Sequence, residues 1–280
     1  MKLFILFILL STTLHARRVM VTSFEPFPGR SDNGSQLTVD ALNQLPSTPD
    51  VEYVYCTLPI LYDQAALKAQ ECFENMNPKP DMVISTGENG CNLRLESKFM
   101  NLDANAALAD NSGIRRYFNR IDRSAPFHEL STLPLTDMYC AGIDPSVARR
   151  VTASDNPGNF VCNNTAFILN RFFKERQIPY GFIHVPMPRS QDCQVEYPDV
   201  AQTIHTMIRA GVSALNRNTP EGEPFSCEVQ IPLVQQVATL ENVARINCEN
   251  QMQRALQNIP GAEKAPFIPK QNTSVPNSKN

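Results

Sequence analysis

The chain has 280 residues, a formal net charge of −3, and 42% hydrophobic against 19% charged residues. This composition is typical of a globular protein and excludes a disordered chain, because enough apolar side chains are present to form a core. The slightly acidic balance, without any run of Lys and Arg, gives no electrostatic footprint for nucleic acid.

Residues 1–16 have the pattern of a secretory signal peptide. Lys2 precedes an unbroken apolar run from Leu3 to Leu10, and a polar stretch follows that ends at Ala16. The apolar run is too short to cross a bilayer, and no other segment is long and apolar enough to do so. We therefore expect an exported protein, periplasmic or extracellular, that has no membrane attachment once the signal is removed.

After this leader, apolar and β-branched segments alternate with helical patterns. The predicted strands are 18–24, 51–58, 81–86, 151–154 and 180–185. The predicted helices are 35–45, 62–76, 145–150, 163–176 and 199–216, whereas 88–140 is expected to be mixed and rich in loops. The alternation predicts an α/β fold with a largely parallel central sheet and helices on both faces, an α/β/α sandwich.

The composition changes near the end of the last predicted core helix. We assign one α/β domain to 17–216 and a partly helical C-terminal extension to 217–264. The segment 265–280 is polar and rich in proline, which is typical of a flexible tail.

The eight cysteines favour disulfides, because an exported chain enters an oxidising compartment. None of them has the CxxC spacing of a zinc ribbon or a thioredoxin motif. If one cysteine has a task as a free thiol, seven remain and one of these is left unpaired. Among nearby pairs, Cys227 and Cys248 are our best local candidates for a bridge.

The sequence carries no dinucleotide-binding, P-loop, nucleophile-elbow or zinc-protease motif. After removal of the leader only His128, His184 and His205 remain, and they share no metal-ligand spacing. We therefore expect no catalytic metal.

Cys162 begins the predicted helix 163–176, directly after a turn at Pro157 and Gly158. A helix N-terminus favours a thiolate, so this pattern predicts a lowered pKa for the thiol and N–H groups that receive an oxyanion. The alternative for an exported chain is a disulfide or a buried core cysteine.

His184 lies near the carboxyl end of the strand 180–185, 22 residues after Cys162. One helix and one connection separate the two, so both can lie at the same edge of the sheet. A cysteine with a nearby imidazole and a carboxylate that orients it is the minimum for nucleophilic acyl transfer. Glu96 and Glu88 are both candidates for the carboxylate, and a structural core histidine is the alternative for His184.

Four segments, in order, resemble the pyroglutamyl peptidase I family of cysteine peptidases. They are TSFEPFPGRSDNGS (22–35), TGENGCNLRLESKFMN (86–101), SDNPGNFVCN (154–163) and GFIHVP (181–186). The resemblance implies hydrolysis of the amide bond after an N-terminal pyroglutamate without a cofactor. It also implies an α/β sandwich and pyroglutamylated peptides as substrates.

The resemblance further implies roles for individual residues. Cys162 becomes the nucleophile, His184 the general base and Glu96 the third member of the triad. The residues implied for substrate binding are Phe24, Phe27, Asn33 and Glu88.

The likeness also has departures. Pro28 stands where the family has Gly, Gly34 follows Asn33 in place of Pro, and no Arg lies about ten residues after Glu96. Two alternatives therefore stay open: a cysteine hydrolase for a different amide or acyl substrate, or a non-catalytic binding protein on the same scaffold.

Two N-glycosylation patterns coincide with the candidate site. Asn33 and Asn163 both stand in an N-x-S/T pattern, and a glycan on either would block the site. For this reason we expect a bacterial exported protein rather than a eukaryotic one.

Overall fold

The computed structural model describes residues 16–188 and 193–215. At its centre is a six-stranded sheet in the order β2-β1-β3-β8-β4-β7, and β5 and β6 form a separate two-stranded sheet. The central strands are β1 (Arg17–Phe24), β2 (Val51–Leu58), β3 (Met82–Glu88), β4 (Leu93–Glu96), β7 (Val151–Ser154) and β8 (Tyr180–Val185). The small sheet pairs β5 (Lys98–Met100) with β6 (His128–Leu130).

The sheet is largely parallel, as the alternating pattern predicts. β1 pairs in parallel with both β2 and β3, and β3 pairs in parallel with β8. β4 pairs antiparallel with β8 and parallel with β7. The strands β3 and β8 are almost fully buried apolar segments, because helices cover both faces of the sheet.

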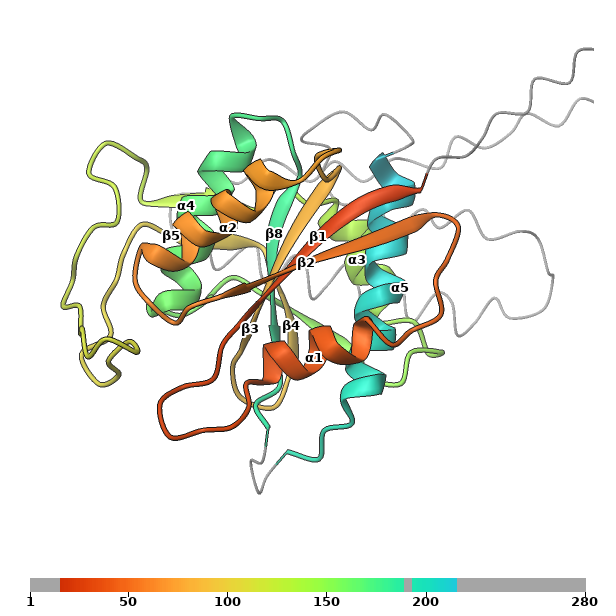
Figure 1. Cartoon of the computed structure of the whole chain (residues 1–280), viewed down its shortest axis with the longest axis horizontal. Helices are drawn as coiled ribbons and strands as arrows, with labels where there is room; N and C mark the ends of the chain where they lie inside the picture. Colours follow the sequence, from red (N-terminus) through yellow and green to blue (C-terminus); the bar gives the residue numbers. More distant parts are fainter. Residues whose placement is uncertain (1–15, 189–192, 216–280) are drawn as a thin grey trace, which may run out of the picture.

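Helices cover the sheet from both sides (Figure 1), so the predicted fold class is confirmed. One face carries α1 (Gly34–Leu42), α3 (Leu135–Gly142) and α5 (Tyr197–Leu215), whose apolar side chains share a core with the sheet. The other face carries α2 (Gln64–Asn75) and α4 (Val161–Lys174), which pack over a second core. Burial of these two apolar layers supplies the main stabilisation of the fold.

The region 88–140 contains more regular structure than its composition suggests, namely β4, β5, β6 and α3. Conversely, the predicted helix at 145–150 is wrong, since this segment consists of turns and bends. The Asp144 side chain accepts hydrogen bonds from the Ser146 backbone N–H at 2.8 Å and from the Ser146 hydroxyl at 2.6 Å. Such local bonds compete with helix formation, which explains the turn.

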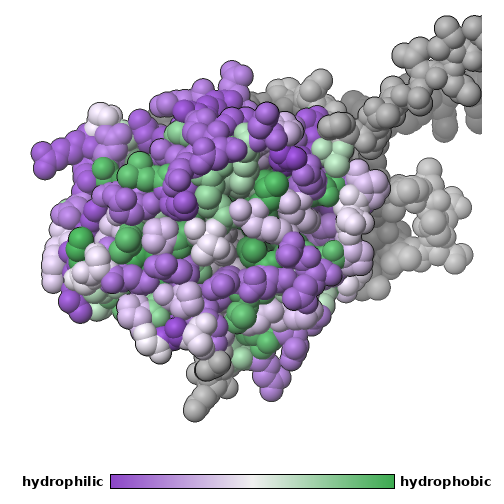
Figure 2. All heavy atoms as spheres, in the orientation of Figure 1, coloured by the Kyte–Doolittle hydropathy of each residue, from purple (hydrophilic) through white to green (hydrophobic). Residues whose placement is uncertain are grey.

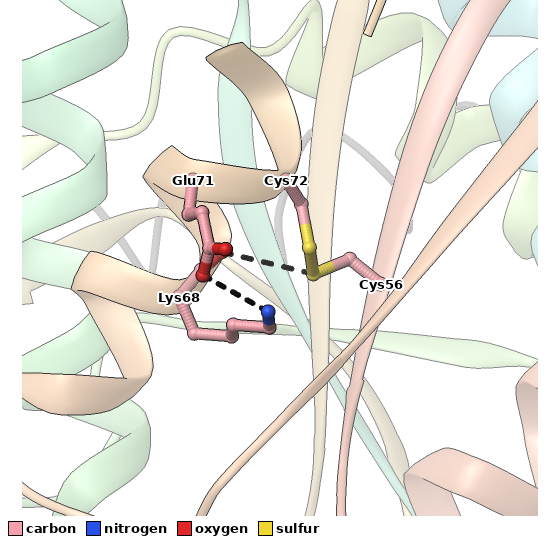
Figure 3. The surroundings of a disulfide bond; sticks show 4 residues. All are labelled: Cys56, Lys68, Glu71 and Cys72. Atoms are coloured by element: carbon pink, nitrogen blue, oxygen red, sulfur yellow. Dashed lines mark hydrogen bonds and ion pairs between the residues drawn. A yellow bond between two sulfur atoms is a disulfide. The ribbon is translucent and has the colours of Figure 1, made fainter. Parts of the chain in front are cut away.

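Disulfides connect elements on both sides of the sheet. Cys56 in β2 is bonded to Cys72 in α2, with the Lys68–Glu71 ion pair beside it (Figure 3). Cys91, just after β3, is bonded to Cys193, which precedes α5. Cys140 is disulfide-bonded as well. Several sequence-based predictions concern residues that the structure does not describe. They are the leader 1–16, of which only residue 16 is described, the Cys227–Cys248 bridge, and the segments 217–264 and 265–280.

On the face drawn in Figure 2, apolar residues of the described ranges lie in small groups among polar ones. No helix within the described residues combines the length and the apolar character that crossing a membrane requires.

Candidate active site

The site lies at the carboxyl ends of β3 and β8. Gly87 and His184 are register partners in these two parallel strands, and Glu88 pairs with Val185 one residue further on. Open α/β sheets bind their ligands at this edge. The two strands end at Glu88 and Val185, and a loop follows each of them.

His184 is held by Glu96 through a buried hydrogen bond. Its Nδ1 lies 2.8 Å from Glu96 Oε1, and both side chains are almost completely buried. The antiparallel pairing places Glu96 opposite Phe182, so Glu96 is a diagonal neighbour of His184 on the same face of the sheet. A carboxylate at Nδ1 fixes the imidazole tautomer and leaves Nε2 for proton exchange.

Cys162 lies in the first turn of α4, next to the same strands. A Cβ atom added to Gly87 would lie 2.8 Å from Cys162 Sγ and 2.8 Å from Cζ of Phe182. The thiol therefore occupies the space that a side chain at Gly87 would need. Because Gly87 is the register partner of His184, the thiol lies next to the strand pair that carries His184. Cys162 is also a free cysteine, whereas the other cysteines of the described ranges are disulfide-bonded.

The electrostatics of Cys162 differ from the expectation for a helix N-terminus. Burial raises the pKa of the Cys162 thiol to about 12, and the carboxylates of Glu88 and Glu96 add to the rise. The predicted lowering of the pKa is therefore wrong for the described site, because desolvation and two negative charges outweigh the helix dipole. The thiol is protonated at neutral pH, so a base must remove its proton when it attacks.

The raised pKa has a consequence for alkylation. Because iodoacetamide reacts with the thiolate, the rate at Cys162 is expected to keep rising by about tenfold per pH unit from pH 7 to 10. An unperturbed thiol would level off above about pH 8.5. Mass spectrometry of the oxidised protein after timed alkylation measures this. A plateau below pH 7 would instead indicate a preformed thiolate–imidazolium pair.

Gly87 is required by this packing, and its replacement tests the position of the sulfur. In Gly87→Ala the new methyl group would displace Cys162 Sγ or the Phe182 ring. A 1 Å misplacement of a reacting atom can cost about 100-fold in rate, so kcat/KM is expected to fall by about that factor. The matched control is Gly142→Ala, whose Cβ would meet Val151 Cγ1 at 2.4 Å, away from the site. The control should lose stability but keep kcat/KM per folded molecule. Equal losses of kcat/KM in both variants would contradict the placement of Sγ.

An aromatic wall stands beside the thiol. Phe27 and Phe160 are stacked, with ring centroids 6.3 Å apart and an interplanar angle of 16°, and Tyr62 meets Phe160 edge-on at 5.5 Å. Phe24 contributes differently, because its side chain is only 2% exposed and packs within the core. Phe160 is not among the site residues predicted from the sequence, although an aromatic residue two positions before the candidate nucleophile is a usable signal.

Asn33 is the N-cap of α1 rather than an open ligand group. Its Oδ1 accepts hydrogen bonds from Ser35 N at 2.9 Å and Ser35 Oγ at 2.7 Å, and its Nδ2 donates to the Glu25 carbonyl at 3.1 Å. This capping fixes the start of α1 and the direction of the loop that carries Phe27.

Glu88 is also engaged by this loop. Arg30 donates to both Glu88 oxygens, through Nη1 to Oε1 and through Nη2 to Oε2 at 2.9 Å, and the Gly34 N–H donates to Oε2 at 2.7 Å. Glu88 therefore tethers the loop 25–34 to the end of β3. The sequence analysis did not single out Arg30, which also lies over the Phe27 ring at 5.6 Å.

A partly buried ion-pair network fixes the start of α4. Asn164 donates to Asp63 Oδ1 and Asp103 Oδ2, and Arg116 contacts Asp103 at 2.7 Å and Asp63 at 2.5 Å. Asp103 is fully buried, and burial raises its pKa to about 6 although Arg116 opposes the rise. The guanidinium of Arg116 also covers the Tyr62 ring at 4.4 Å.

Removing the cation from this network should destabilise the fold. Arg116→Met is expected to lower the free energy of unfolding by about 3 kcal/mol, because it leaves the Asp103 carboxylate buried without its counter-charge. Urea unfolding of the oxidised protein measures the change. The control Arg115→Met alters an exposed neighbour and should stay within about 0.5 kcal/mol of the parent. Equal effects of the two variants would contradict the role of this network.

The comparison with known proteins agrees with this geometry. A family model described as pyroglutamyl peptidase matches residues 17–217. The chain belongs to the pyroglutamyl peptidase family. This membership confirms the resemblance and places the protein among the cysteine-type exopeptidases.

Pyroglutamyl peptidases of several bacteria are similar to this chain over most of their length. The pyrrolidone-carboxylate peptidase of Vibrio vulnificus strain YJ016 is 28% identical over 187 residues, covering 66% of this chain and 85% of the relative. The corresponding protein of Clostridium perfringens is 29% identical over 214 residues, covering 72% and 95% respectively.

Solved structures of the family share the fold of this chain. The pyroglutamyl peptidase I of Bacillus amyloliquefaciens matches with a TM-score of 0.64 at 22% identity, covering 70% of this chain and 95% of that chain. The pyrrolidone carboxyl peptidase of Thermococcus litoralis matches with a TM-score of 0.63 at 22% identity, covering 78% and 100%.

Proposed function

We propose that this protein hydrolyses the amide bond after an N-terminal pyroglutamate through a triad of Cys162, His184 and Glu96. The observation that carries the proposal is the buried His184–Glu96 hydrogen bond next to the free thiol of Cys162, in a chain of the pyroglutamyl peptidase family. No metal or cofactor takes part in this mechanism.

The reaction follows from the protonation states at the site. Because Nδ1 of His184 is engaged by Glu96, Nε2 is the atom that accepts the Cys162 proton as Sγ attacks the carbonyl carbon. The imidazolium then donates this proton to the leaving amine, and a water molecule hydrolyses the thioester with His184 again acting as base. Glu96 stabilises the transient imidazolium, and N–H groups of the first turn of α4 receive the oxyanion.

The pocket for pyroglutamate is built by the aromatic wall and the tethered loop. Pyroglutamate is flat, small and uncharged, which suits the near-parallel rings of Phe27 and Phe160. Asn33 and Glu88 shape this pocket by holding the loop 25–34 in place, and Phe24 supports the loop from the core. The occupied polar atoms of Asn33 favour such a positioning role over direct reading of the lactam.

The specificity is tested by comparing pyroglutamyl and prolyl amides with the same fluorogenic leaving group. We expect kcat/KM for the pyroglutamyl amide to be at least about 100-fold higher, because the prolyl amide would bring a protonated amine into an aromatic pocket that suits the uncharged lactam. Equal values would mean that the lactam is not recognised and that the enzyme acts on a different amide or acyl substrate.

We further propose that the protein is exported. The leader pattern of residues 1–16 and the two disulfides Cys56–Cys72 and Cys91–Cys193 support an oxidising compartment. Asn33 is 1% and Asn163 0% exposed, so neither amide is accessible to a glycosyl donor in the folded protein. Non-reducing mass spectrometry of the native protein should show an N-terminus near residue 17, no glycan and an alkylatable thiol at Cys162 beside bridged cysteines. Retention of residues 1–16 in that material would contradict export.

A further inference from the structure

A basic cavity of about 830 Å³ opens beside α4, outside the aromatic wall. It lies between the end of the loop before α2, the surface of α4 and the long connection from β5 to β6. Its lining consists of Asp63, Arg116, Phe118, Asn119, Arg120, Ile121, Arg123 and Ile168.

The cavity carries an unbalanced positive charge. Arg116 is compensated by Asp63 and Asp103. Arg120 donates only to the Ala125 carbonyl, and neither it nor Arg123 has a carboxylate partner among the described residues. Two guanidinium groups therefore face an acid-poor cavity on a protein whose net charge is −3, which is the arrangement expected around an anionic ligand.

The nearest acid on the same segment does not neutralise this charge. Asp122 accepts hydrogen bonds from Ser124 N at 2.8 Å and Ser124 Oγ at 2.7 Å, and it lies 3.6 Å from Arg171 on α4. Its carboxylate is thus directed to Ser124 and Arg171 rather than to the two arginines of the cavity.

The cavity is close to the reacting thiol. Ile168 of the lining lies six residues after Cys162 on α4, which is about 9 Å along a helix axis. Asp63 of the lining receives hydrogen bonds from Asn164, two residues after Cys162. An extended peptide covers this distance with about three residues.

The cavity also presents an apolar surface. Phe118 is 82% exposed and has a positive φ of 52°, an unfavourable backbone for a bulky residue. Of the three non-glycine residues with positive φ in the described ranges, Phe118 and Asp63 both line this cavity. Strained backbone of this kind is concentrated at functional sites.

We propose that this cavity is a subsite for the leaving part of the substrate and selects an acidic side chain about three residues after the pyroglutamate. Arg120 and Arg123 bind the carboxylate, and Phe118 with Ile121 and Ile168 covers the adjoining apolar part of the peptide. The proposal rests on the proposed peptidase function and names the substrate class: pyroglutamyl peptides with an acidic residue near their N-terminus.

Hydrolysis of three matched peptides tests the subsite. The peptides start with pyroglutamate and differ only three residues later, where they carry Glu, Gln or Lys. With the parent enzyme we expect kcat/KM for the Glu peptide to exceed that for the Gln peptide by about tenfold, with the Lys peptide lowest. In Arg120→Gln/Arg123→Gln this ratio should approach one, and in the parent it should shrink as salt is raised.

The matched control is Arg115→Gln/Arg176→Gln, which removes the same charge at exposed positions that do not line the cavity. It should keep most of the preference for the Glu peptide. Equal hydrolysis of all three peptides by the parent, or an equal loss of preference in both double variants, would overturn the subsite.

Failure of the peptidase function can be told apart from failure of the subsite. Fluorescence anisotropy with Cys162→Ala protein measures binding of the labelled Glu, Gln and Lys peptides without turnover. A preference for the Glu peptide that disappears in the Arg120/Arg123 double variant supports the subsite even if no hydrolysis occurs. Tight binding of a sulfated oligosaccharide with no difference among the peptides would assign the basic cavity to a polysaccharide and overturn the proposal.

Discussion

Replacing Cys162 by alanine is expected to abolish hydrolysis of pyroglutamyl amides, with a loss in kcat of about 10⁴-fold or more. Without Sγ there is no nucleophile and no covalent intermediate, so only binding and oxyanion contacts remain. A fluorogenic pyroglutamyl amide assayed at saturating concentration measures the residual rate. Because the thiol fills the space above Gly87, the alanine variant also removes packing atoms, so its unfolding must be measured in parallel.

Cys162→Ser is the companion variant that keeps the shape of the side chain. It should also lose at least about 10³-fold in kcat, because a hydroxyl oxygen is intrinsically a much weaker nucleophile than sulfur. Near-parental stability of Cys162→Ser together with this loss separates chemistry from folding. Activity that survives in Cys162→Ala would refute the triad outright.

Glu96→Gln is expected to lower kcat by about 10³-fold, less than the loss of the nucleophile. The amide oxygen can still accept a hydrogen bond from His184 Nδ1–H, so part of the orientation is kept. The negative charge that stabilises the imidazolium is lost. This loss has a large effect because Glu96 is buried and its Oε1 lies only 2.8 Å from Nδ1 of His184. Steady-state kinetics should show the effect in kcat, with KM changed little.

Glu129→Gln is the matched control for this substitution. Glu129 is likewise a buried glutamate and pairs with Arg171 and Lys174, away from His184. It should leave kcat within about twofold of the parent while costing stability. Equal losses of kcat in Glu96→Gln and Glu129→Gln would mean that the His184–Glu96 bond has no specific part in the reaction.

The sequence alone predicted the strands β1, β2, β3 and β8 of the parallel sheet and proposed Cys162 and His184 as members of the candidate site. β1, β3 and β8 are short apolar segments flanked by turns and helices, and this local pattern has few other solutions in an α/β chain. Because Cys162 begins a helix and His184 ends the strand after it, chain connectivity alone brings them to the same edge of the sheet.

The local pattern left two glutamates as candidates, the family resemblance favoured Glu96, and the tertiary structure shows that Glu96 contacts His184. Glu88 and Glu96 are eight residues apart in one segment, and nothing local distinguishes them. The antiparallel return of β4 along β8 brings Glu96 to His184, whereas Arg30 from a distant loop occupies Glu88. Long-range pairing of this kind depends on contacts between segments far apart in the chain, which periodicity does not encode.

The thiol pKa and the turn at 145–150 differ from the sequence-based prediction for different reasons. The helix dipole at Cys162 is a local property, but the burial and the two carboxylates that overcome it come from other elements of the fold. At 145–150 the cause is local. The Asp144 side chain accepts a hydrogen bond from the Ser146 backbone N–H, and this bond competes with helix formation. Local sequence therefore determined the elements outside 88–150, while charge, solvation and partner choice at the site were decided by the assembled sheet and its loops.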